Sequence, residues 1–247
     1  AMNCKWRLPR RGRRGASRIE FWGNWKRPTT MQLLRKPKPS IDELICVPHV
    51  DVKHLRRHVF SNGITPDKQE VRTTVWKLFL QFDGPDRAKW DDEEKALHQE
   101  FLNFVDNFYP KETEEFAETA PTASADLVLL HEIDKDIRRL FPKNPFFTND
   151  NTRKCIRQIL FVHSKFLRTC PYVQGMNDLA GILFYVFTNG QPRPTSVSVT
   201  YFCFAFLMTL INDWYDSKKD WTVKGIHAVL YRIDTILARK EPEVFRH

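Results

Sequence analysis

Residues 126–140 read DLVLLHEIDKDIRRL, and in this stretch apolar side chains recur at steps of three and four. Such steps match the 3.6 residues per turn of an α-helix, so the apolar positions fall on one stripe. Pro142 and Pro145 follow, and proline ends a helix because its ring removes a backbone donor. The stretch therefore predicts an amphipathic helix from about residue 126 to residue 140. Its stripe consists of Leu127, Leu130, Ile133, Ile137 and Leu140.

The same helical period occurs in most of the chain beyond residue 68. No stretch shows a convincing period of two with turn signals, so we expect an all-α fold without strands. Residues 110–124, with four glutamates and two prolines, are typical of a surface loop. Asn149 or Asp150 is expected to cap the helix that follows. The expected helices cover about 68–82, 92–108, 126–140, 151–170, 176–187, 197–212 and 223–238.

The N-terminal residues differ from the rest in charge. Residues 1–38 hold 12 Lys and Arg and one acidic residue, Glu20, for a net charge of +11. The other 209 residues hold 27 basic and 29 acidic side chains, so their net charge is −2. The net charge of +9 for the whole chain therefore comes from residues 1–38. We expect residues 1–40 to form an extended basic arm and residues 41–247 to form the folded domain.

Three interpretations of this arm stay open: a solvated tail, a contact with an anionic membrane through residues 1–38, or a contact with nucleic acid. Tryptophans between the basic residues slightly favour the last two. The −2 of the remaining chain argues against a protein that acts mainly by binding a membrane or RNA, and no specific nucleic acid is predicted.

The cysteines and histidines suggest no metal site. The five cysteines are odd in number and contain no C-x-x-C pair, so neither zinc nor a disulfide framework is predicted. His163 and His227 lie among apolar residues on expected helices, where we expect structural side chains with satisfied hydrogen bonds. The longest apolar run, about 197–211, is short for a bilayer span, and no secretory signal is recognisable. A reducing, cytoplasmic setting fits these features.

Two short motifs contain the candidate functional residues. Arg139 closes IDKDIRR (133–139), and Gln174 lies in PYVQGMND (171–178). Arginine supplies a permanent planar cation with five donors, whereas glutamine supplies donors and an acceptor but no acid or base. Neither group cleaves a bond alone. Together they suit a reaction in which water must be oriented while charge builds on phosphate oxygens, as in GTP hydrolysis.

These motifs resemble the two signature fingers of TBC-domain proteins, the GTPase-activating proteins of Rab GTPases. The resemblance runs from about Leu55 to the end of the chain and implies a multi-helical TBC-type domain with both fingers in its N-terminal lobe. Leu140 stands where many members have Thr, but residues 129–140 resemble a subgroup related to the family's thirteenth member. The matching motifs are Ile133-x-x-Asp136-x-x-Arg139, Tyr172-x-Gln174-Gly175 and Arg72-x-x-Val75-Trp76-Lys77-Leu78.

The resemblance implies roles for these residues. Arg139 would enter the active site of a GTP-bound Rab, and Gln174 would replace the Rab's own water-orienting glutamine. Asp136 would hold the guanidinium in position. Supporting or partner-binding roles fall to Asp136, Tyr172, Gly175, Asn177 and Arg72.

Some of these signals have simpler interpretations. Asp136 and Arg139 have the spacing of an ordinary surface ion pair on a helix, worth roughly 0.2–0.5 kcal/mol. Arg138 competes for the finger role, but adjacent helical residues point about 100° apart, and the register of the family motif selects Arg139. Asn177 could cap a helix or also touch the partner.

The leading prediction is a GTPase-activating protein in vesicle trafficking, cytoplasmic or peripheral on endomembranes, and not a catalyst of its own substrate. No G-x-x-x-x-G-K loop occurs, so GTP and Mg²⁺ are expected to come with the Rab, and no cofactor is predicted. Residues 243–247 resemble the start of another element, and TBC domains normally continue into a further helical lobe. The resemblance therefore implies either that the sequence is a fragment or that this member of the family is short. The alternatives are a non-catalytic module that binds a Rab or an adaptor, and a membrane- or RNA-binding protein acting through its arm.

Overall fold

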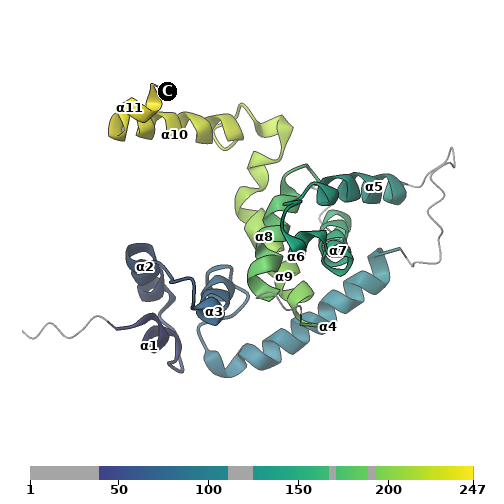
Figure 1. The fold of residues 1–247 in the computed structure, drawn as a ribbon, viewed down its shortest axis with the longest axis horizontal. Coiled ribbons are helices and arrows are strands. Elements are labelled where there is room, and N and C mark those ends of the chain that lie inside the picture. The colour runs from purple at the N-terminus through teal and green to yellow at the C-terminus, as the bar shows by residue number, and fades with distance from the viewer. Residues whose placement is uncertain (1–38, 111–124, 167–170, 189–192, 247) are drawn as a thin grey trace, which may run out of the picture. The chain divides into compact units, whose positions relative to one another are not determined.

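The computed structural model describes residues 39–110, 125–166, 171–188 and 193–246. Over these residues the regular structure is helical, and only an isolated bridge between His49 and Asp86 is of the β type (Figure 1). The predicted all-α fold is therefore confirmed. The predicted arm and the predicted loop of residues 110–124 lie almost entirely outside the described residues.

All the predicted helices are present, with most ends displaced by a few residues. Residues 167–170, which were predicted to end one of them, lie outside the described residues. Asn149 caps the helix that follows it, because its Oδ1 accepts hydrogen bonds from the N–H groups of Asn151 (2.9 Å) and Thr152 (3.2 Å). The helices are α3 (Gln69–Phe79), α4 (Trp90–Phe108), α5 (Ala125–Arg138), α7 (Asp150–Phe166), α8 (Met176–Thr188), α9 (Ser196–Ile211) and α10 (Ile226–Lys240).

Further helical segments were not among the predicted helices, although residues 243–247, which overlap α11 (Pro242–Phe245), were expected to start another element. At the start of the domain, Ser40 and Glu43 form a capping box, and the Asp51 side chain accepts from the N–H of His54 at 2.9 Å. The apolar residues of these two helices are few, and they are buried against α3, so the local pattern alone was too weak to reveal them. The additional segments are α1 (Ile41–Ile45), α2 (Val52–Asn62), α6 (Pro145–Thr148), α11 (Pro242–Phe245) and the 3₁₀ turns η1 (Arg87–Lys89), η2 (Asn212–Trp214) and η3 (Ser217–Lys219).

The main core lies between α4, α5, α7, α8 and α9. Aromatic side chains fill its centre, among them Phe101, Phe161, Phe184 and Phe204. Within the described residues, the segment Ser196–Trp214 is long and apolar enough to cross a bilayer by length and composition. The α9 helix instead packs against α4, α7 and α8, and its buried residues belong to the core.

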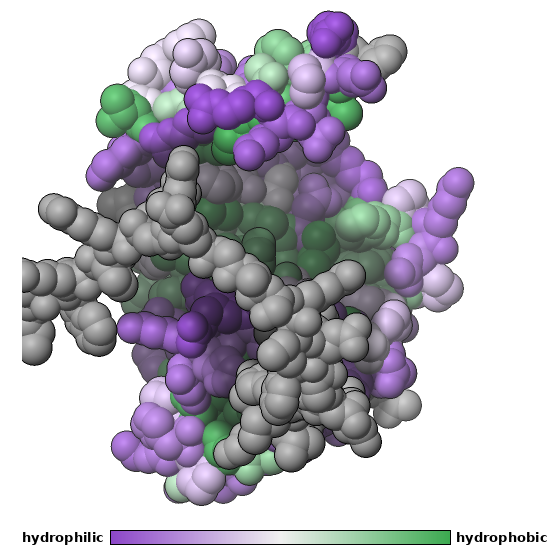
Figure 2. Space-filling view, turned by 90° about the vertical axis from the view of Figure 1, so that its left-hand side faces the viewer, coloured by the Kyte–Doolittle hydropathy of each residue, from purple (hydrophilic) through white to green (hydrophobic). Residues whose placement is uncertain are grey.

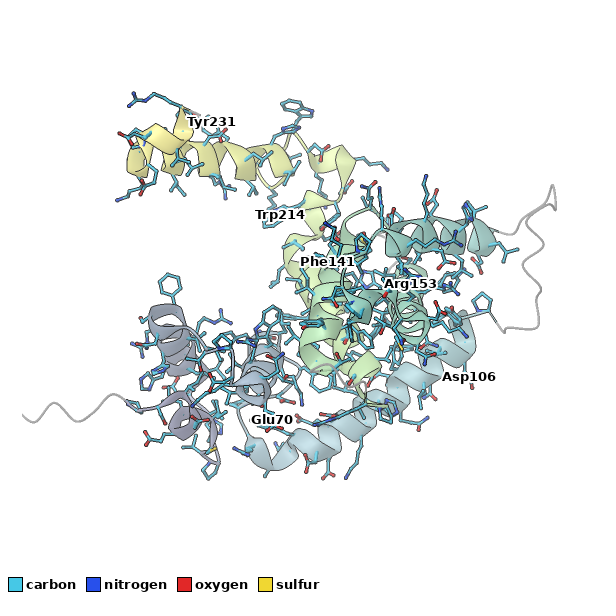
Figure 3. All side chains as sticks on the ribbon, in the orientation of Figure 1. Glu70, Asp106, Phe141, Arg153, Trp214 and Tyr231 are labelled. Atoms are coloured by element: carbon cyan, nitrogen blue, oxygen red, sulfur yellow. The ribbon has the colours of Figure 1, made fainter. Side chains whose placement is uncertain are left out.

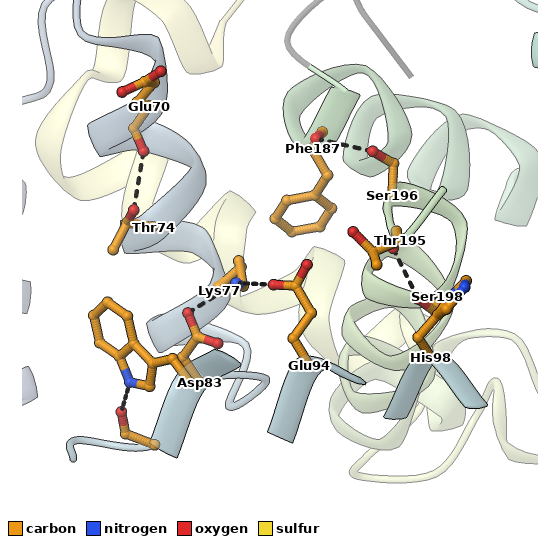
Figure 4. Close-up of polar contacts among 12 residues, drawn as sticks. Glu70, Thr74, Lys77, Asp83, Glu94, His98, Phe187, Thr195, Ser196 and Ser198 are labelled. Atoms are coloured by element: carbon orange, nitrogen blue, oxygen red, sulfur yellow. Dashed lines mark hydrogen bonds and ion pairs between the residues drawn. The ribbon is translucent and has the colours of Figure 1, made fainter. Parts of the chain in front are cut away.

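A polar network joins α3 to α4 beside this core. Nζ of Lys77 lies 2.8 Å from Oε2 of Glu94 and 3.2 Å from Oδ2 of Asp83 (Figure 4). Burial raises the pKa of Asp83 to about 6, against the opposing effect of the Lys77 charge. A smaller core is formed by buried residues of α1, α2 and α3. Because Lys77 belongs to α3 and Glu94 to α4, this network links the smaller core to the main one.

One histidine in the core departs from the expectation. His163 is fully buried on α7, and neither ring nitrogen has a hydrogen-bond partner. Its ring instead meets Phe204 edge-on at 4.8 Å, and burial lowers its pKa to about 4. The predicted satisfied hydrogen bonds are therefore wrong for His163. His227 is exposed and stacks on Trp221 at 3.9 Å.

The last helices leave apolar side chains in solvent. The predicted helix begins at Ile226 and not at Val223, which is 79% exposed. No residue of α10 or α11 is buried. Figure 2 shows apolar surface beside polar surface on α10, at the top of the view. The exposed apolar side chains of α10 are Leu230, Tyr231, Ile233 and Ile236.

The end of α5 lies against α8. A Cβ added to Gly181 would stand 2.7 Å from Cδ2 of Leu140 and 3.2 Å from the Phe147 ring, so only glycine allows this close approach without a shift of its neighbours. Helix α5 ends at Arg138, two residues earlier than predicted. Phe141 has φ +38° and precedes Pro142, whose ring disfavours helical backbone at the residue before it. The turn after α5 thus carries Arg139.

Candidate functional site

Both oxygens of the Asp136 carboxylate are used within the site. Asp136 lies in the last turn of α5 and is buried. Its Oδ1 accepts a hydrogen bond from Nη2 of Arg139 at 2.6 Å, and its Oδ2 accepts one from the Tyr172 hydroxyl at 2.7 Å. One carboxylate therefore connects the turn after α5 with the segment that leads into α8.

The Arg139 side chain extends from this buried anchor into solvent. It is 52% exposed, whereas the Asp136 side chain is 9% exposed. A hydrogen bond to a charged partner is shorter and stronger than a neutral one, so it restricts the guanidinium while leaving its other N–H groups available. The ion pair is therefore more than a solvated surface pair, because one of its two charges is buried.

Tyr172 keeps its proton in this setting. Burial raises the pKa of its hydroxyl, and the adjacent Asp136 charge raises it further. The phenol therefore remains a hydrogen-bond donor across the physiological range. As a donor it satisfies the second carboxylate oxygen, which would otherwise be buried without a partner.

Gln174 is exposed in the turn that precedes α8. Gly175 has φ +100°, a conformation that side chains with a Cβ rarely adopt. Its N–H donates to Oδ1 of Asn177 at 3.0 Å, and Nδ2 of Asn177 donates to the Asp136 carbonyl at 3.5 Å. Gln174 thus lies between two residues, Tyr172 and Asn177, whose side chains both form hydrogen bonds to Asp136 at the end of α5.

The Asn177 side chain makes its contacts within the chain. The residue is buried, and its side chain bridges the Gly175 amide and α5. It therefore neither faces solvent nor caps α8 through the amides of the helix's first turn. Its observed role is to fix the turn that presents Gln174.

Arg72 does not join the other predicted residues. Its guanidinium donates to the side chain of Gln69 and to the carbonyl of Thr65 at 3.1 Å. A longer contact of 3.4 Å reaches the carbonyl of Ile64. Arg72 therefore holds the loop before α3. The structure shows no contact between Arg72 and the cluster of Asp136, Arg139 and Tyr172, which we call the Asp136 cluster.

Sequence reasoning missed two features near this cluster. Tyr215 lies beside the Gly175 turn, since a Cβ added to Gly175 would stand 3.8 Å from its ring and hydroxyl. A basic pocket between α5 and α7 contains Arg153 and Arg157. The i, i+4 spacing of these two arginines on one helix was the available signal, because it places both on one face.

Comparisons with known proteins agree on one kind of domain. A family model described as the Rab-GTPase-TBC domain matches residues 69–247. Human TBC1 domain family member 13 is 31% identical, over 83% of this chain and 73% of its own length. Human TBC1 domain family member 22A is 22% identical, over 83% of this chain and 40% of its own length.

A solved structure shares the fold. The crystal structure of the Ypt/Rab-GAP domain of Gyp1p matches with a TM-score of 0.66 and 19% sequence identity. The match covers 85% of this chain and 68% of the other. At this identity the likeness concerns the fold and not the chemistry.

Proposed function

The chain belongs to the Rab-GTPase-TBC domain family, and on that premise we propose that it accelerates GTP hydrolysis by a Rab-family small GTPase. Arg139 and Gln174 are the two groups that it supplies to the GTPase active site. GTP and Mg²⁺ belong to the GTPase, because the chain has no phosphate-binding loop of its own.

Arg139 acts on the charge of the transition state. Phosphoryl transfer to water spreads negative charge over the transferred group and the leaving oxygen, and an arginine supplied from outside is worth about 10³–10⁵ in rate. The Asp136 anchor sets the guanidinium in advance, so less conformational entropy is lost when the two proteins meet. A lysine could not reproduce the planar fork.

Gln174 acts on the attacking water. An amide has an acceptor for a water proton and donors for a neighbouring oxygen, which suits it to orient a nucleophile without exchanging protons. Its turn is tied on both sides to Asp136, the residue that holds Arg139. This shared anchor is the observation that carries the proposal, because two groups acting on one phosphate must keep a fixed relative position.

The proposal is tested by single-turnover phosphate release from a panel of GTP-loaded Rabs, with and without this chain. We expect at least one Rab to be stimulated, and we expect Arg139→Ala to reduce that stimulation by about 10³-fold or more. Arg139→Lys should fail as well, whereas the matched variant Arg138→Ala should retain the stimulated rate at a saturating concentration of the two proteins.

Two outcomes would count against this proposal. A stable Rab complex without faster phosphate release across the panel would indicate a non-catalytic binding module. Loss of activity in Arg138→Ala together with retention in Arg139→Ala would show that the register of the arginine finger is wrong.

We further propose a cytoplasmic protein that is peripheral on endomembranes, with residues 1–38 in contact with anionic lipid. The support is the +11 charge of that segment, since basic residues near an anionic leaflet gain about 1 kcal/mol each.

A further inference from the structure

A basic pocket lies between the last turns of α5 and the first turns of α7. Its volume is about 360 Å³. Arg153 lies on α7, in the first turns of the helix (Figure 3). The charged side chains that line the pocket are Arg138, Arg153, Lys154, Arg157, Asp134 and Asp150.

The charge of this pocket is positive although the folded domain is not. Four cations and two carboxylates line the pocket. Lys154 is engaged in a further interaction, so the local positive excess rests on the three arginines, whereas residues 39–247 carry −2 in total. Asp134 is engaged by Nε of Arg157. Asp150 is 91% exposed and 3.9 Å from Arg153, so it neutralises little. The pocket therefore attracts anions.

The two arginines on α7 are held in place from one side. Nε of Arg153 donates to the Phe147 carbonyl at 3.1 Å, and Nε of Arg157 donates to Asp134. A guanidinium has five N–H groups, so donation through Nε leaves the terminal nitrogens of Arg153 to other acceptors. Such restraint lowers the entropy that binding a carboxylate would cost.

The pocket adjoins the turn that carries Arg139. Arg138 lines the pocket and Arg139 follows it directly, so their Cα atoms are about 3.8 Å apart. A specific protein interface buries about 800 Å² on each partner, which corresponds to a patch about 30 Å across. A GTPase docked on Arg139 would therefore cover the rim of the pocket as well.

From this placement we propose that the pocket receives an acidic side chain of the GTPase that docks on Arg139. This inference rests on the proposed function and adds a second contact to it. Such a contact accelerates association by electrostatic steering and disfavours GTPases that present a basic residue at the same place. It does not alter the chemistry at the phosphate.

The test variant is Arg138→Gln/Lys154→Glu, which changes the pocket charge by three without removing the two anchored arginines. The matched control is Lys89→Gln/Lys95→Glu, which changes the charge equally at two lysines that are 66% and 77% exposed near the start of α4. Association rates with a GTP-loaded Rab are measured at low and high salt, beside melting temperatures and hydrolysis rates at saturation.

We expect the pocket variant to associate about tenfold more slowly than the wild type at low salt, with the difference disappearing near 1 M salt, where charges are screened within about 3 Å. The saturated hydrolysis rate should stay within about twofold, and the control should behave as wild type. Equal association of variant and wild type, with stimulation intact, would overturn the pocket assignment and leave the proposed function standing.

Two further outcomes would also overturn it. Absence of both binding and stimulation by the wild type across the Rab panel would remove the pocket proposal together with the proposed function. A free-anion site would show itself if inorganic pyrophosphate raised the melting temperature of the wild type but not of the variant, while Rab association remained equal in the two proteins.

Discussion

At the scale of single residues, Asp136 has more influence than its ordinary spacing to Arg139 suggests. An isolated pair at i, i+3 contributes a few tenths of a kcal/mol, roughly 0.2–0.5. Here the carboxylate is buried and also accepts from Tyr172, which comes 36 residues later in the chain. Removing one donor would leave a buried acceptor unsatisfied, and that costs more than the contact itself gains.

We predict that Tyr172→Phe lowers both stability and GTPase stimulation. The ring remains but Oδ2 of Asp136 loses its donor, which should cost about 1–3 kcal/mol in the free energy of unfolding measured by urea denaturation. Stimulation should fall about tenfold at a temperature where the variant stays folded, because Arg139 and the Gln174 turn lose their common anchor. The matched control is Tyr185→Phe, at a half-exposed ring on α8 whose aromatic contacts phenylalanine preserves. Equal behaviour of the two variants would contradict this role for Asp136.

We predict that the chain stimulates a Rab whose own catalytic glutamine has been replaced by alanine. Gln174 would orient the attacking water from outside, and an activator that supplied only an arginine could not make good that loss. Gln174→Ala should then remove most of the stimulation of both the normal and the glutamine-less Rab in phosphate-release assays. Gln174 is exposed, so the variant should keep its melting temperature. Full activity of Gln174→Ala on the glutamine-less Rab would contradict the water-orienting role of Gln174.

At the scale of elements, the helices could be predicted from the sequence, but their contacts could not. Each of α3, α4, α5 and α7 carries its own apolar period, and α8 and α9 are rich in apolar residues, so both kinds of signal are local. Helices α1 and α2 bury few apolar residues of their own. These residues are buried against α3, which lies later in the chain, so the local sequence of α1 and α2 does not reveal the helices. The distance between the end of α5 and the middle of α8 is likewise a property of packing, as the approach of Leu140 to Gly181 illustrates.

The same limit applied to the candidate site. The motifs indicated Arg139, Asp136, Tyr172 and Gln174. In the structure the side chains of Arg139 and Tyr172 both bond to Asp136. Gln174 lies in the adjoining turn. The motifs also indicated Arg72. This residue lies on α3, and its side chain bonds to the loop before that helix and not to Asp136, which a contiguous motif could not reveal. The lack of hydrogen-bond partners for His163 was equally invisible, because it depends on residues from another helix.

We predict that His163 makes the α7–α9 packing sensitive to acid. Its pKa is about 4 in the folded state and about 6.5 when unfolded, so the unfolded chain binds the proton first as the pH falls. The stability it provides is complete above pH 6.5 and is lost as the pH falls towards 4, by about 3 kcal/mol in total. Urea denaturation at several pH values should show that His163→Leu removes this loss.

Asp83 provides a control of opposite sign. Its pKa is raised to about 6, so its contribution is complete below its ordinary pKa and is lost as the pH rises through 6. Relative to the wild type, Asp83→Asn should therefore gain stability as the pH rises from about 4 to 6. His163→Leu should lose its relative advantage over the same interval. A wild-type minus His163→Leu difference that does not vary with pH would refute the buried neutral imidazole.

At the scale of the whole molecule, charge is divided between two parts of the chain. Residues 1–38 carry +11 and the remaining residues carry −2. The candidate site and the basic pocket are built from residues of the second part. On the proposed function, the folded domain acts on a GTPase, and we propose that the arm binds a different partner, an anionic surface.

We predict that deletion of residues 1–38 leaves Rab stimulation in solution nearly unchanged and weakens binding to anionic vesicles. The attraction should decline with salt, since charges are screened over roughly 10 Å at 0.1 M. Co-sedimentation with vesicles of phosphatidylcholine and phosphatidylserine measures the binding, and pure phosphatidylcholine vesicles serve as the control. A second variant, with Arg10, Arg11, Arg13 and Arg14 replaced by glutamine, keeps the length and the tryptophans of the arm. If charge is the cause, that variant should lose part of the vesicle binding in proportion to the four charges removed. Unchanged vesicle binding after the full deletion would contradict a membrane role for residues 1–38. Loss of Rab stimulation in solution would show that these residues contribute to the action on the GTPase.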